Sequence, residues 1–313
     1  GLPGANLSLP VLPGSVSLIL WLPALWVLLP RGCPGRYVAW LALAAVVLYR
    51  PPAPPKDCVD IYTLDVGQGL ASVIRTRSRA LLFDTGPAYR NGGNSAEYVI
   101  LPFLQSQAIR RLDMLVVSHS DQDHAGGVTS VLAALPVAGL LSGETLNTGG
   151  VGAACVAGQT WRWDGVDFAL LSPEHGSGFT GNNASCVLAV SAGDSSLLLT
   201  GDIERPAEQR LSRCGRLRPV KLVHVPHHGS ATSSSAAFVD ALQADVAVVS
   251  AGYGNRWGFP KESVVTRWRQ AGATVLNTAE SGAIQHRLCR NAGITLQREY
   301  RRSAARYWHD IDD

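Results

Sequence analysis

The sequence predicts a layered α/β domain preceded by a short apolar segment that resembles membrane-spanning helices. Residues 1–49 carry only Arg31 and Arg36 as charged side chains, whereas both signs of charge are spread through the rest of the 313 residues. From residue 58 onward, short strand-like runs alternate with glycine turns and helical stretches, which is typical of sheets covered by helices. Because the first residue is Gly rather than Met, we expect the chain to be part of a longer protein.

The N-terminal segment contains two apolar runs, residues 9–29 and residues 37–49. A helix that crosses a bilayer needs about 20 apolar residues, and only the first run reaches that length. Prolines interrupt it, but neighbouring helices can satisfy the backbone groups that proline frees. We therefore predict a transmembrane hairpin within residues 1–50, with a buried hairpin of a soluble protein as the alternative. A signal peptide is disfavoured, because no basic start precedes the run and no small-residue cleavage site follows it.

The two arginines between the runs predict a cytoplasmic loop, which would leave the following domain outside the cell membrane. Residues 51–57 are rich in proline and predict a stiff, extended linker. The net charge of +3 is too small to indicate nucleic-acid binding by itself.

None of the six cysteines forms a CxxC pair, so a structural zinc knot is not expected. If the domain lies in an oxidising compartment, Cys155 and Cys186 are the first candidates for a disulfide. Cys214 and Cys289 are the remaining candidate pair.

We expect residues 58–290 to form the main domain and residues 291–313 to form a basic tail. We expect strands at residues 59–66, 70–74, 80–83, 114–117, 197–199, 222–225 and 246–250. A helix is expected from Asn94 to about residue 107, because Asn94 can cap it and Glu97 stands at the capping-box position. Another helix is expected over residues 235–242.

The clearest chemical motif follows the strand at residues 114–117. Two imidazoles and two carboxylates occur there within six residues, namely His119, Asp121, Asp123 and His124. At these spacings they cannot all face one side of a helix, but on an irregular loop they can converge on two adjacent cations. Mixed nitrogen and oxygen ligands favour Zn²⁺ or Mn²⁺. The motif therefore predicts a site for one or two divalent ions, with a solvated polar loop as the alternative.

Two later strand ends fit the same centre. Asp202 follows the strand at residues 197–199 and is placed to bridge two metals, although it could instead cap the next helix. His227 and His228 follow the strand at residues 222–225. Adjacent side chains point in different directions, so one imidazole can reach a metal or a leaving group while the other packs.

Several polar side chains near these histidines are candidates for binding phosphate or DNA. Hydroxyl groups and backbone N–H groups at the start of a helix can hold a phosphate, although simple capping of the helix is an equally good interpretation. The candidates are Ser230, Thr232, Ser233 and Asn255.

These motifs together resemble those of the C-terminal metallo-β-lactamase-like domain of the ComEC family, the inner-membrane channel proteins of bacterial DNA uptake. The matching segments are residues 64–69, 84–87, 118–127, 201–202 and 226–230. The resemblance implies a metallo-β-lactamase αββα sandwich after the last transmembrane segments of the competence region. It also implies a domain on the periplasmic or extracellular side that degrades or handles the non-transported DNA strand. Its partners would be single-stranded DNA, the membrane and the remainder of the competence channel.

The resemblance also implies a divalent metal pair, Mn²⁺ or Zn²⁺. By position, His119 and Asp121 would hold one ion, Asp123 and His124 the other, and Asp202 would bridge them. Asp123 would also orient the attacking water. His227 or His228 would protonate the leaving sugar oxygen.

Two positions depart from the superfamily pattern. One expected histidine ligand falls at Asn182 and Asn183, and the last one falls at Phe259, which cannot coordinate a metal. We therefore predict a weakly held second metal and slow DNA cleavage, unless His227 or His228 fills the missing position. A catalytically degenerate domain that guides single-stranded DNA is the alternative function, and a small-molecule lactonase or esterase is disfavoured by the attached apolar segment.

Overall fold

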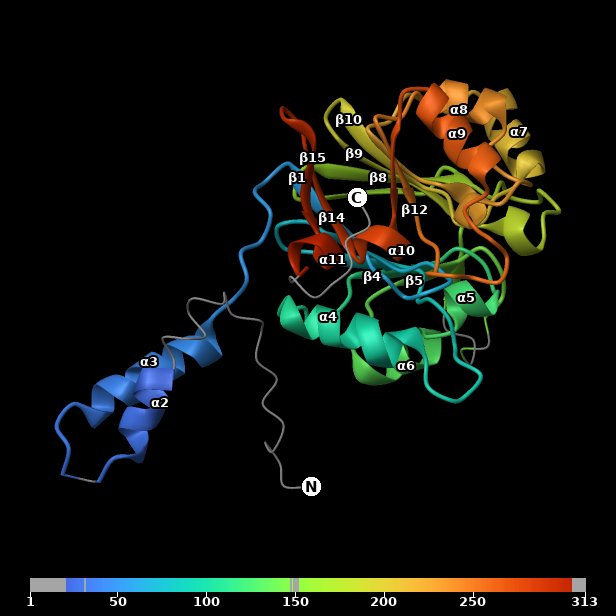
Figure 1. Cartoon of the computed structure of the whole chain (residues 1–313). Helices are drawn as coiled ribbons and strands as arrows, with labels where there is room; N and C mark the ends of the chain where they lie inside the picture. Colours follow the sequence, from blue (N-terminus) through green and yellow to red (C-terminus); the bar gives the residue numbers. More distant parts are fainter. Residues whose placement is uncertain (1–20, 31, 147, 149–151, 306–313) are drawn as a thin grey trace. The chain divides into compact units, whose positions relative to one another are not determined.

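A computed structural model describes residues 21–30, 32–146, 148 and 152–305 (Figure 1). The chain divides into two compact units. One unit comprises the described part of residues 1–52 together with residues 101–110, and the other comprises residues 53–100 and the described residues from 111 onward. All strands of the described residues belong to the second unit, which we call the sandwich unit.

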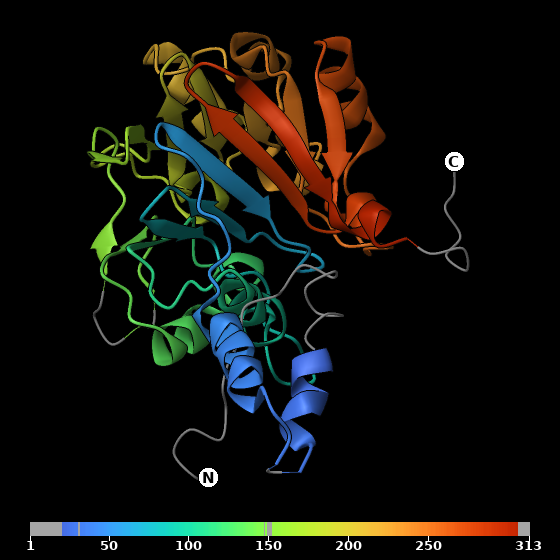
Figure 2. The same cartoon turned by 90° about the vertical axis from the view of Figure 1, so that its left-hand side faces the viewer.

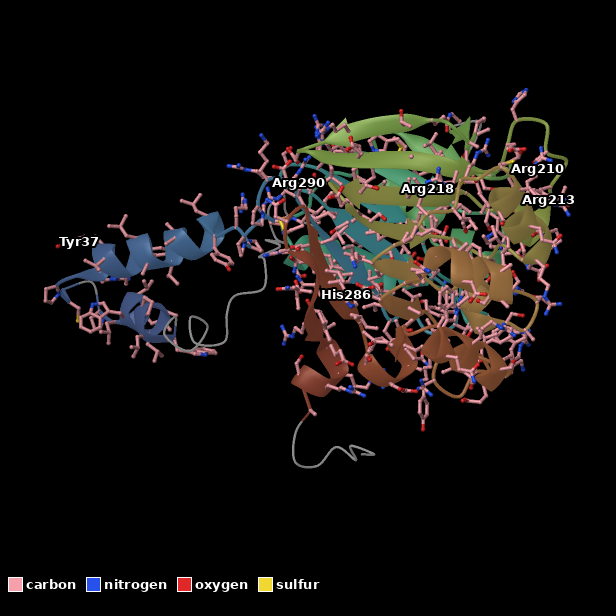
Figure 3. All side chains as sticks on the ribbon, turned by 90° about the horizontal axis from the view of Figure 1, so that it is seen from above. Tyr37, Arg210, Arg213, Arg218, His286 and Arg290 are labelled. Atoms are coloured by element: carbon pink, nitrogen blue, oxygen red, sulfur yellow. A yellow bond between two sulfur atoms is a disulfide. The ribbon has the colours of Figure 1, made fainter. Side chains whose placement is uncertain are left out.

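The first unit contains α2 (Trp21–Leu28), α3 (Arg36–Leu48) and α4 (Leu101–Ser106). The guanidinium of Arg36 donates to the carbonyl of Val27 at 2.6 Å and so ties α3 to α2. Large side chains of these helices are exposed, such as Trp21 at 68% and Tyr37, labelled in Figure 3, at 72%. Among the described residues, no helix combines the length and the apolar character needed to cross a membrane. Most of the predicted apolar run at residues 9–29 lies outside the described residues.

The sandwich unit contains two sheets. In the first, the strand order is β15-β14-β1-β2-β3-β4-β5-β6, and in the second it is β13-β12-β11-β10-β9-β8-β7. The strands of the first sheet are β1 (Cys58–Thr63), β2 (Ser72–Arg75), β3 (Ala80–Phe83), β4 (Met114–Val117), β5 (Leu140–Ser142), β6 (Ala153–Ala154), β14 (Ile284–Cys289) and β15 (Gly293–Glu299). Those of the second are β7 (Thr160–Trp163), β8 (Val166–Ser172), β9 (Val187–Ala192), β10 (Ser195–Leu199), β11 (Leu222–His224), β12 (Val246–Val249) and β13 (Thr274–Asn277).

Apolar side chains from both sheets form one core between them. Ile61 and Phe83 of the first sheet and Leu188 and Leu197 of the second belong to this cluster and are fully buried. A second cluster lies between the second sheet and three helices, where Trp268 is almost completely buried. These helices are α7 (Arg205–Arg213), α8 (Ala236–Leu242) and α9 (Glu262–Gln270).

Further helical turns complete the layers. Figure 1 shows α5 and α6 on the side of β4 and β5 that is remote from α7, α8 and α9. The unit is therefore a helix–sheet–sheet–helix sandwich, as predicted. The remaining elements are η1 (Ala96–Ile100), α5 (Gln122–Ala125), α6 (Val128–Ala134), η2 (Gly181–Ala184), η3 (Pro226–Gly229), α10 (Thr278–Ser281) and α11 (Tyr300–Ser303).

The predicted domain boundary at residue 290 is too early. Residues Gly293–Glu299 form β15, which pairs antiparallel with β14, and Figure 2 shows this hairpin beside β1. The strand was hard to find in the sequence because it is an edge strand with largely exposed side chains, and only Ile294 and Leu296 alternate with polar residues before the polar end of the strand. Only residues 306–313 of the predicted basic tail lie outside the described residues.

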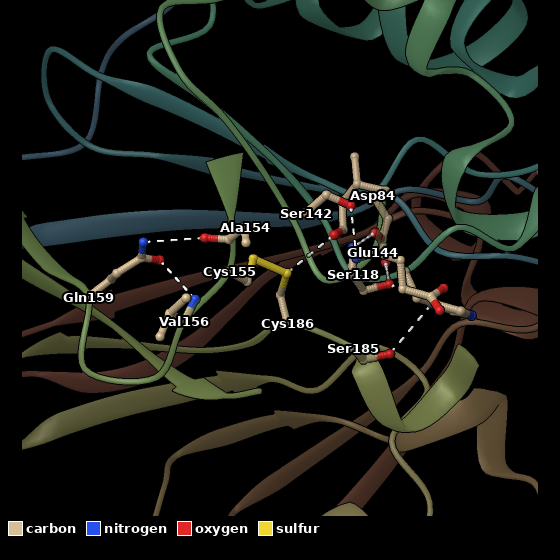
Figure 4. The surroundings of a disulfide bond; sticks show 12 residues. Asp84, Ser118, Ser142, Glu144, Ala154, Cys155, Val156, Gln159, Ser185 and Cys186 are labelled. Atoms are coloured by element: carbon tan, nitrogen blue, oxygen red, sulfur yellow. Dashed lines mark hydrogen bonds between the residues drawn. A yellow bond between two sulfur atoms is a disulfide. The ribbon is translucent and has the colours of Figure 1, made fainter. Parts of the chain in front are cut away.

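The predicted disulfide between Cys155 and Cys186 is confirmed, with 5.8 Å between the Cα atoms (Figure 4). The predicted pair Cys214–Cys289 is wrong, because Cys289 bonds to Cys58 and Cys214 is a free, exposed thiol. Cys58 and Cys289 are register partners at the ends of β1 and β14. Their 231-residue separation conceals that proximity in the sequence.

Candidate metal centre

Four side chains from three strand ends converge in the sandwich unit. The ligand atoms of Asp123, His124, Asp202 and His228 all lie within 4.8 Å of one another. We call these four residues the metal cluster. Asp123 and His124 lie on α5, which begins immediately after the β4 loop, whereas Asp202 follows β10 and His228 lies in η3 after β11.

Asp202 lies at the middle of this arrangement. One carboxylate oxygen is 3.1 Å from His124 Nε2, and the other is 3.4 Å from His228 Nε2. His228 Nε2 also lies 3.4 Å from a carboxylate oxygen of Asp123. The N-cap of α7 is Glu204 rather than Asp202, so the capping alternative for Asp202 does not apply.

His124 is oriented by Asp84, which the sequence did not identify as a site residue. Its Nδ1 donates to the Asp84 carboxylate at 2.7 Å, so Nε2 faces the metal cluster. The hydroxyl and backbone N–H of Ser118 also donate to this buried carboxylate, at 2.8 Å and 2.6 Å. Such a carboxylate–histidine pair fixes the tautomer and raises the basicity of a metal-binding imidazole. Two sequence signals marked Asp84, namely its place directly after the β3 strand and its membership of the family-like segment at residues 84–87.

His228 is held in a strained turn. His227 and His228 have φ values of 51° and 52°, in the left-handed region that non-glycine residues seldom adopt. The Nδ1 of His228 donates to the carbonyl of Ser250 at 2.7 Å, which leaves Nε2 facing the metal cluster. Strained backbone of this kind persists where the surrounding contacts enforce it, and it is concentrated at functional sites.

Two observations fit this set of residues to a cation. The Nε2 atoms of His124 and His228 are 3.2 Å apart while both Nδ1 atoms act as donors, so neutral rings would point two lone pairs at each other. In addition, His119 Nε2 is buried and has no hydrogen-bond partner within the described residues. It lies 3.4 Å from a carboxylate oxygen of Asp121. A divalent cation at the metal cluster would accept both lone pairs, and a cation beside His119 and Asp121 would satisfy the buried His119 nitrogen.

The charges of the metal cluster are strongly coupled. Burial favours the neutral form of Asp202, but the imidazoles of His124 and His228 outweigh it and hold the pKa of Asp202 well below its usual value. Burial likewise opposes charge on His124, yet Asp202 and Asp84 hold its pKa well above the usual value. By contrast, burial and the neighbouring His124 lower the pKa of His119. The raised pKa of His124 reports the negative charge of Asp202 and Asp84 beside its ring, and this charge favours a cation there.

A family model for the metallo-beta-lactamase superfamily matches residues 64–253, which include the whole metal cluster. The chain belongs to the metallo-β-lactamase superfamily. Among curated proteins, it is 42% identical to "Competence protein ComA" of Neisseria gonorrhoeae over 88% of this chain and 39% of that protein. It is 41% identical to "Recombination protein 2" of Haemophilus influenzae over 77% of this chain and 30% of that protein. These similarities confirm the resemblance to ComEC-type competence proteins. The chain spans well under half the length of these relatives.

The first departure from the superfamily pattern has a structural explanation. The side-chain oxygen of Asn183 accepts from the backbone N–H groups of Glu204 and Ala207 and so holds the start of α7. The hydroxyl of Ser185 accepts from the backbone N–H of Asp202 at 3.1 Å. These residues therefore support the metal cluster through the backbone and add no imidazole to it.

The second departure, Phe259, supplies no ligand to the metal cluster. Because His228 supplies an imidazole to the metal cluster, the cluster has four donor groups without a ligand at Phe259. The Phe259 ring instead packs edge-on against His227, with 5.8 Å between ring centroids. The metal cluster therefore needs no donor from Phe259, and weak binding of a second metal stays a prediction.

His227 lies at the exposed border of the metal cluster. Its Nε2 is 3.9 Å from Asp202, and its Nδ1 is 3.2 Å from both a Glu204 carboxylate oxygen and the Thr232 hydroxyl. The His227 side chain is 21% exposed, compared with 3% for His228. Of the two histidines, His228 belongs to the metal cluster and His227 faces the solvent side.

The candidate phosphate-binding residues are placed differently from one another. Ser230 and Thr232 share a 2.9 Å hydroxyl contact beside His227. Ser233 is fully buried and donates to the carbonyl of Pro226. Both ends of the Asn255 amide bond to the backbone of its own loop. Ser233 and Asn255 therefore organise local structure and have little capacity left to contact a ligand.

Proposed function

We propose that the chain is a metal-dependent phosphodiesterase domain of a DNA-uptake channel, which degrades or handles the non-transported single strand. The metal cluster is the observation that carries this proposal, because a buried set of imidazoles and carboxylates suits hydrolysis at phosphorus. Similarity to competence proteins supports DNA as the substrate class. Mn²⁺ or Zn²⁺, as one or two ions, suits the mixed ligands.

A bound divalent ion would lower the pKa of a water molecule and neutralise charge on the phosphate. Asp123, His124, Asp202 and His228 would hold one ion, and His119 with Asp121 would add ligands for a second. The carboxylate of Asp123 is the most exposed of the metal cluster, so it can also accept a proton from the attacking water and orient its oxygen.

His227 is suited to act as the general acid. Hydrolysis forms a bond between the water oxygen and phosphorus and breaks the bond from phosphorus to the sugar oxygen, which then needs a proton. His227 borders the metal cluster without belonging to it, and its exposed edge can reach a bound substrate. Glu204 and Thr232 would keep its ring in position through Nδ1.

We also propose that the domain operates outside the cytoplasm and is attached to the inner membrane. Disulfides persist in oxidising compartments, and two disulfides tie together the sandwich unit. The apolar runs of residues 1–50 and the proline-rich linker at residues 51–57 support membrane attachment and a spacer. The remainder of the channel would then lie next to this domain.

The alternative is a degenerate domain that binds single-stranded DNA without cleaving it. Only one group of four closely spaced donors occurs among the described residues, and Asn183 and Ser185 stand where the superfamily places a further imidazole. These observations favour one firmly held ion over two. The metal content and cleavage activity of the protein distinguish the two functions.

The test is to measure bound metal by mass spectrometry and cleavage of end-labelled single-stranded DNA with the purified chain. We expect His228→Ala to lose both metal and cleavage, and His227→Ala to retain metal but lose most of the cleavage. His175→Ala, at an exposed histidine, is the matched control. A chain that binds metal yet never cleaves DNA would favour the guiding function.

A further inference from the structure

We propose that the loop of residues 252–261, which we call the aromatic loop, is a stacking platform for the bases of single-stranded DNA. The proposal rests on the function proposed above, because it adds a substrate-binding surface to the same site. It also assigns a role to Phe259, the residue that replaces an expected ligand.

The aromatic loop exposes large aromatic rings. Tyr253 is 86% exposed and Trp257 is 45% exposed. The rings of Trp257 and Phe259 are nearly parallel, with an interplanar angle of 10° and centroids 6.4 Å apart. Exposed aromatic surface of this extent, gathered on one loop, indicates a binding surface.

Cationic side chains are interleaved with these rings. The guanidinium of Arg256 lies over the Trp257 ring at 4.2 Å, and the ammonium of Lys261 lies 5.5 Å from the Phe259 ring centroid. Aromatic rings that stack on bases, combined with cations that contact the phosphates, are typical of proteins that bind single strands. An exposed guanidinium is held only weakly over a ring, so a base can replace Arg256 there while Arg256 turns to a phosphate.

The aromatic loop lies directly against the turn that carries His227 and His228. The backbone N–H of Lys261 donates to the carbonyl of Gly229 at 2.9 Å. Pro260 packs so closely on this turn that a Cβ atom at Gly229 would lie 2.6 Å from it. Phe259 contacts His227, whose Nε2 is 3.9 Å from Asp202. A base stacked on the aromatic loop would therefore place its own phosphate, or the next one, beside the metal cluster.

The loop is held in one shape before any ligand binds. The Asn255 amide donates to the carbonyls of Gly252 and Phe259 at 2.9 Å and 2.7 Å, and its oxygen accepts from the Phe259 N–H at 2.9 Å. Preorganisation of this kind reduces the entropy that binding loses. It also explains why Asn255, a predicted DNA-binding residue, acts here as a positioning residue.

Stacking on this loop predicts a preference for single strands. The bases of a duplex are stacked on each other and paired, so they cannot lie on protein rings, whereas the bases of a single strand can. Phosphate contacts alone would produce no dependence on the bases. If the loop has only a structural role, substitutions of its exposed rings would not change DNA binding.

The experiment measures fluorescence anisotropy of a labelled oligothymidylate and of an abasic oligonucleotide of the same length, with the full chain in EDTA. We expect the parent chain to bind the oligothymidylate more tightly. Trp257→Ala should weaken that binding at least about tenfold, while binding of the abasic strand changes little. Trp257→Phe should retain most of the affinity.

Tyr98→Ala is the matched control, because Tyr98 is also exposed and stacked on another ring, that of Tyr89, but lies on η1. If Trp257→Ala does not fold, Tyr253→Ala decides the matter, since that side chain projects into solvent.

Equal binding of the two oligonucleotides by the parent chain would overturn the proposal. A folded Trp257→Ala or Tyr253→Ala variant with the parent's ratio of affinities for the oligothymidylate and the abasic strand would also overturn it.

Failure of this proposal and failure of the proposed function give different results. Binding is measured without metal, so it does not depend on hydrolysis. If the parent chain cleaves DNA but the aromatic-loop variants keep the parent's ratio of affinities for the two oligonucleotides, only the stacking platform is refuted. If binding depends on the bases but the parent chain does not cleave DNA, the stacking platform is supported and the phosphodiesterase function is refuted.

Discussion

His224 and His286 are buried between the two sheets and predict a steep loss of stability in mild acid. His286, labelled in Figure 3, is fully buried, and neither of its ring nitrogens has a hydrogen-bond partner within the described residues. His224 Nε2 contacts the Thr63 hydroxyl at 2.9 Å across the sheets. Burial lowers the pKa of His286 to about 4, and burial together with the nearby His286 lowers that of His224 to about 3.

The magnitude follows from linkage between protonation and folding. In the unfolded chain these imidazoles take up protons below about pH 6.5, whereas in the folded chain they stay neutral until the pH approaches 4. The unfolded state therefore binds more protons in this window, so stability falls as pH falls. At about 1.4 kcal/mol per pH unit, each histidine destabilises the fold by about 2 kcal/mol between pH 7 and pH 5, or about 4 kcal/mol for both.

The assay is urea unfolding of the purified chain at pH 7, 6 and 5, with EDTA present so that release of metal does not contribute. Between pH 7 and pH 5, the free energy of unfolding should fall by about 2 kcal/mol less in His286→Leu than in the parent. The slope of that free energy against urea concentration should be unchanged. The matched control is His175→Asn, at an exposed histidine, and it should behave like the parent. Parallel losses in His286→Leu and the parent would refute the assignment of a neutral, buried imidazole.

Three other changes test the site and the fold. We expect Asp84→Asn to weaken metal binding roughly 10- to 100-fold in titrations, because it removes the carboxylate that orients a metal-facing imidazole; an unchanged affinity would contradict that role. Phe259→His should leave the metal content per chain unchanged, since His228 already supplies the imidazole, and a clear rise would restore the deficiency argument. Replacing Cys155 and Cys186 by Ser should reduce the free energy of unfolding by up to about 4 kcal/mol in urea, whereas Cys214→Ser should have no such effect.

Local patterns in the sequence were sufficient for the layered fold and for most of the donor set. The apolar run of β4 and the dense ligand loop after it needed no tertiary information, because both are contiguous in the chain. The same holds for Asp202 and for the histidine pair, since each directly follows an apolar strand. The ends of such strands meet at one edge of a sandwich, so their convergence could be expected.

Tertiary structure alone decided which partners meet across long separations. The Cys58–Cys289 disulfide and β15 depend on strand pairing between the two ends of the domain, and no local pattern reports it. The choice of His228 over His227 depends on the left-handed turn and on the carbonyl of Ser250, which come from separate segments. The sequence likewise left open whether a neighbouring histidine compensates for Phe259, and the packing brings His228 into the metal cluster. A residue type shows what a position can ligate, but only packing shows whether another side chain already supplies that ligand.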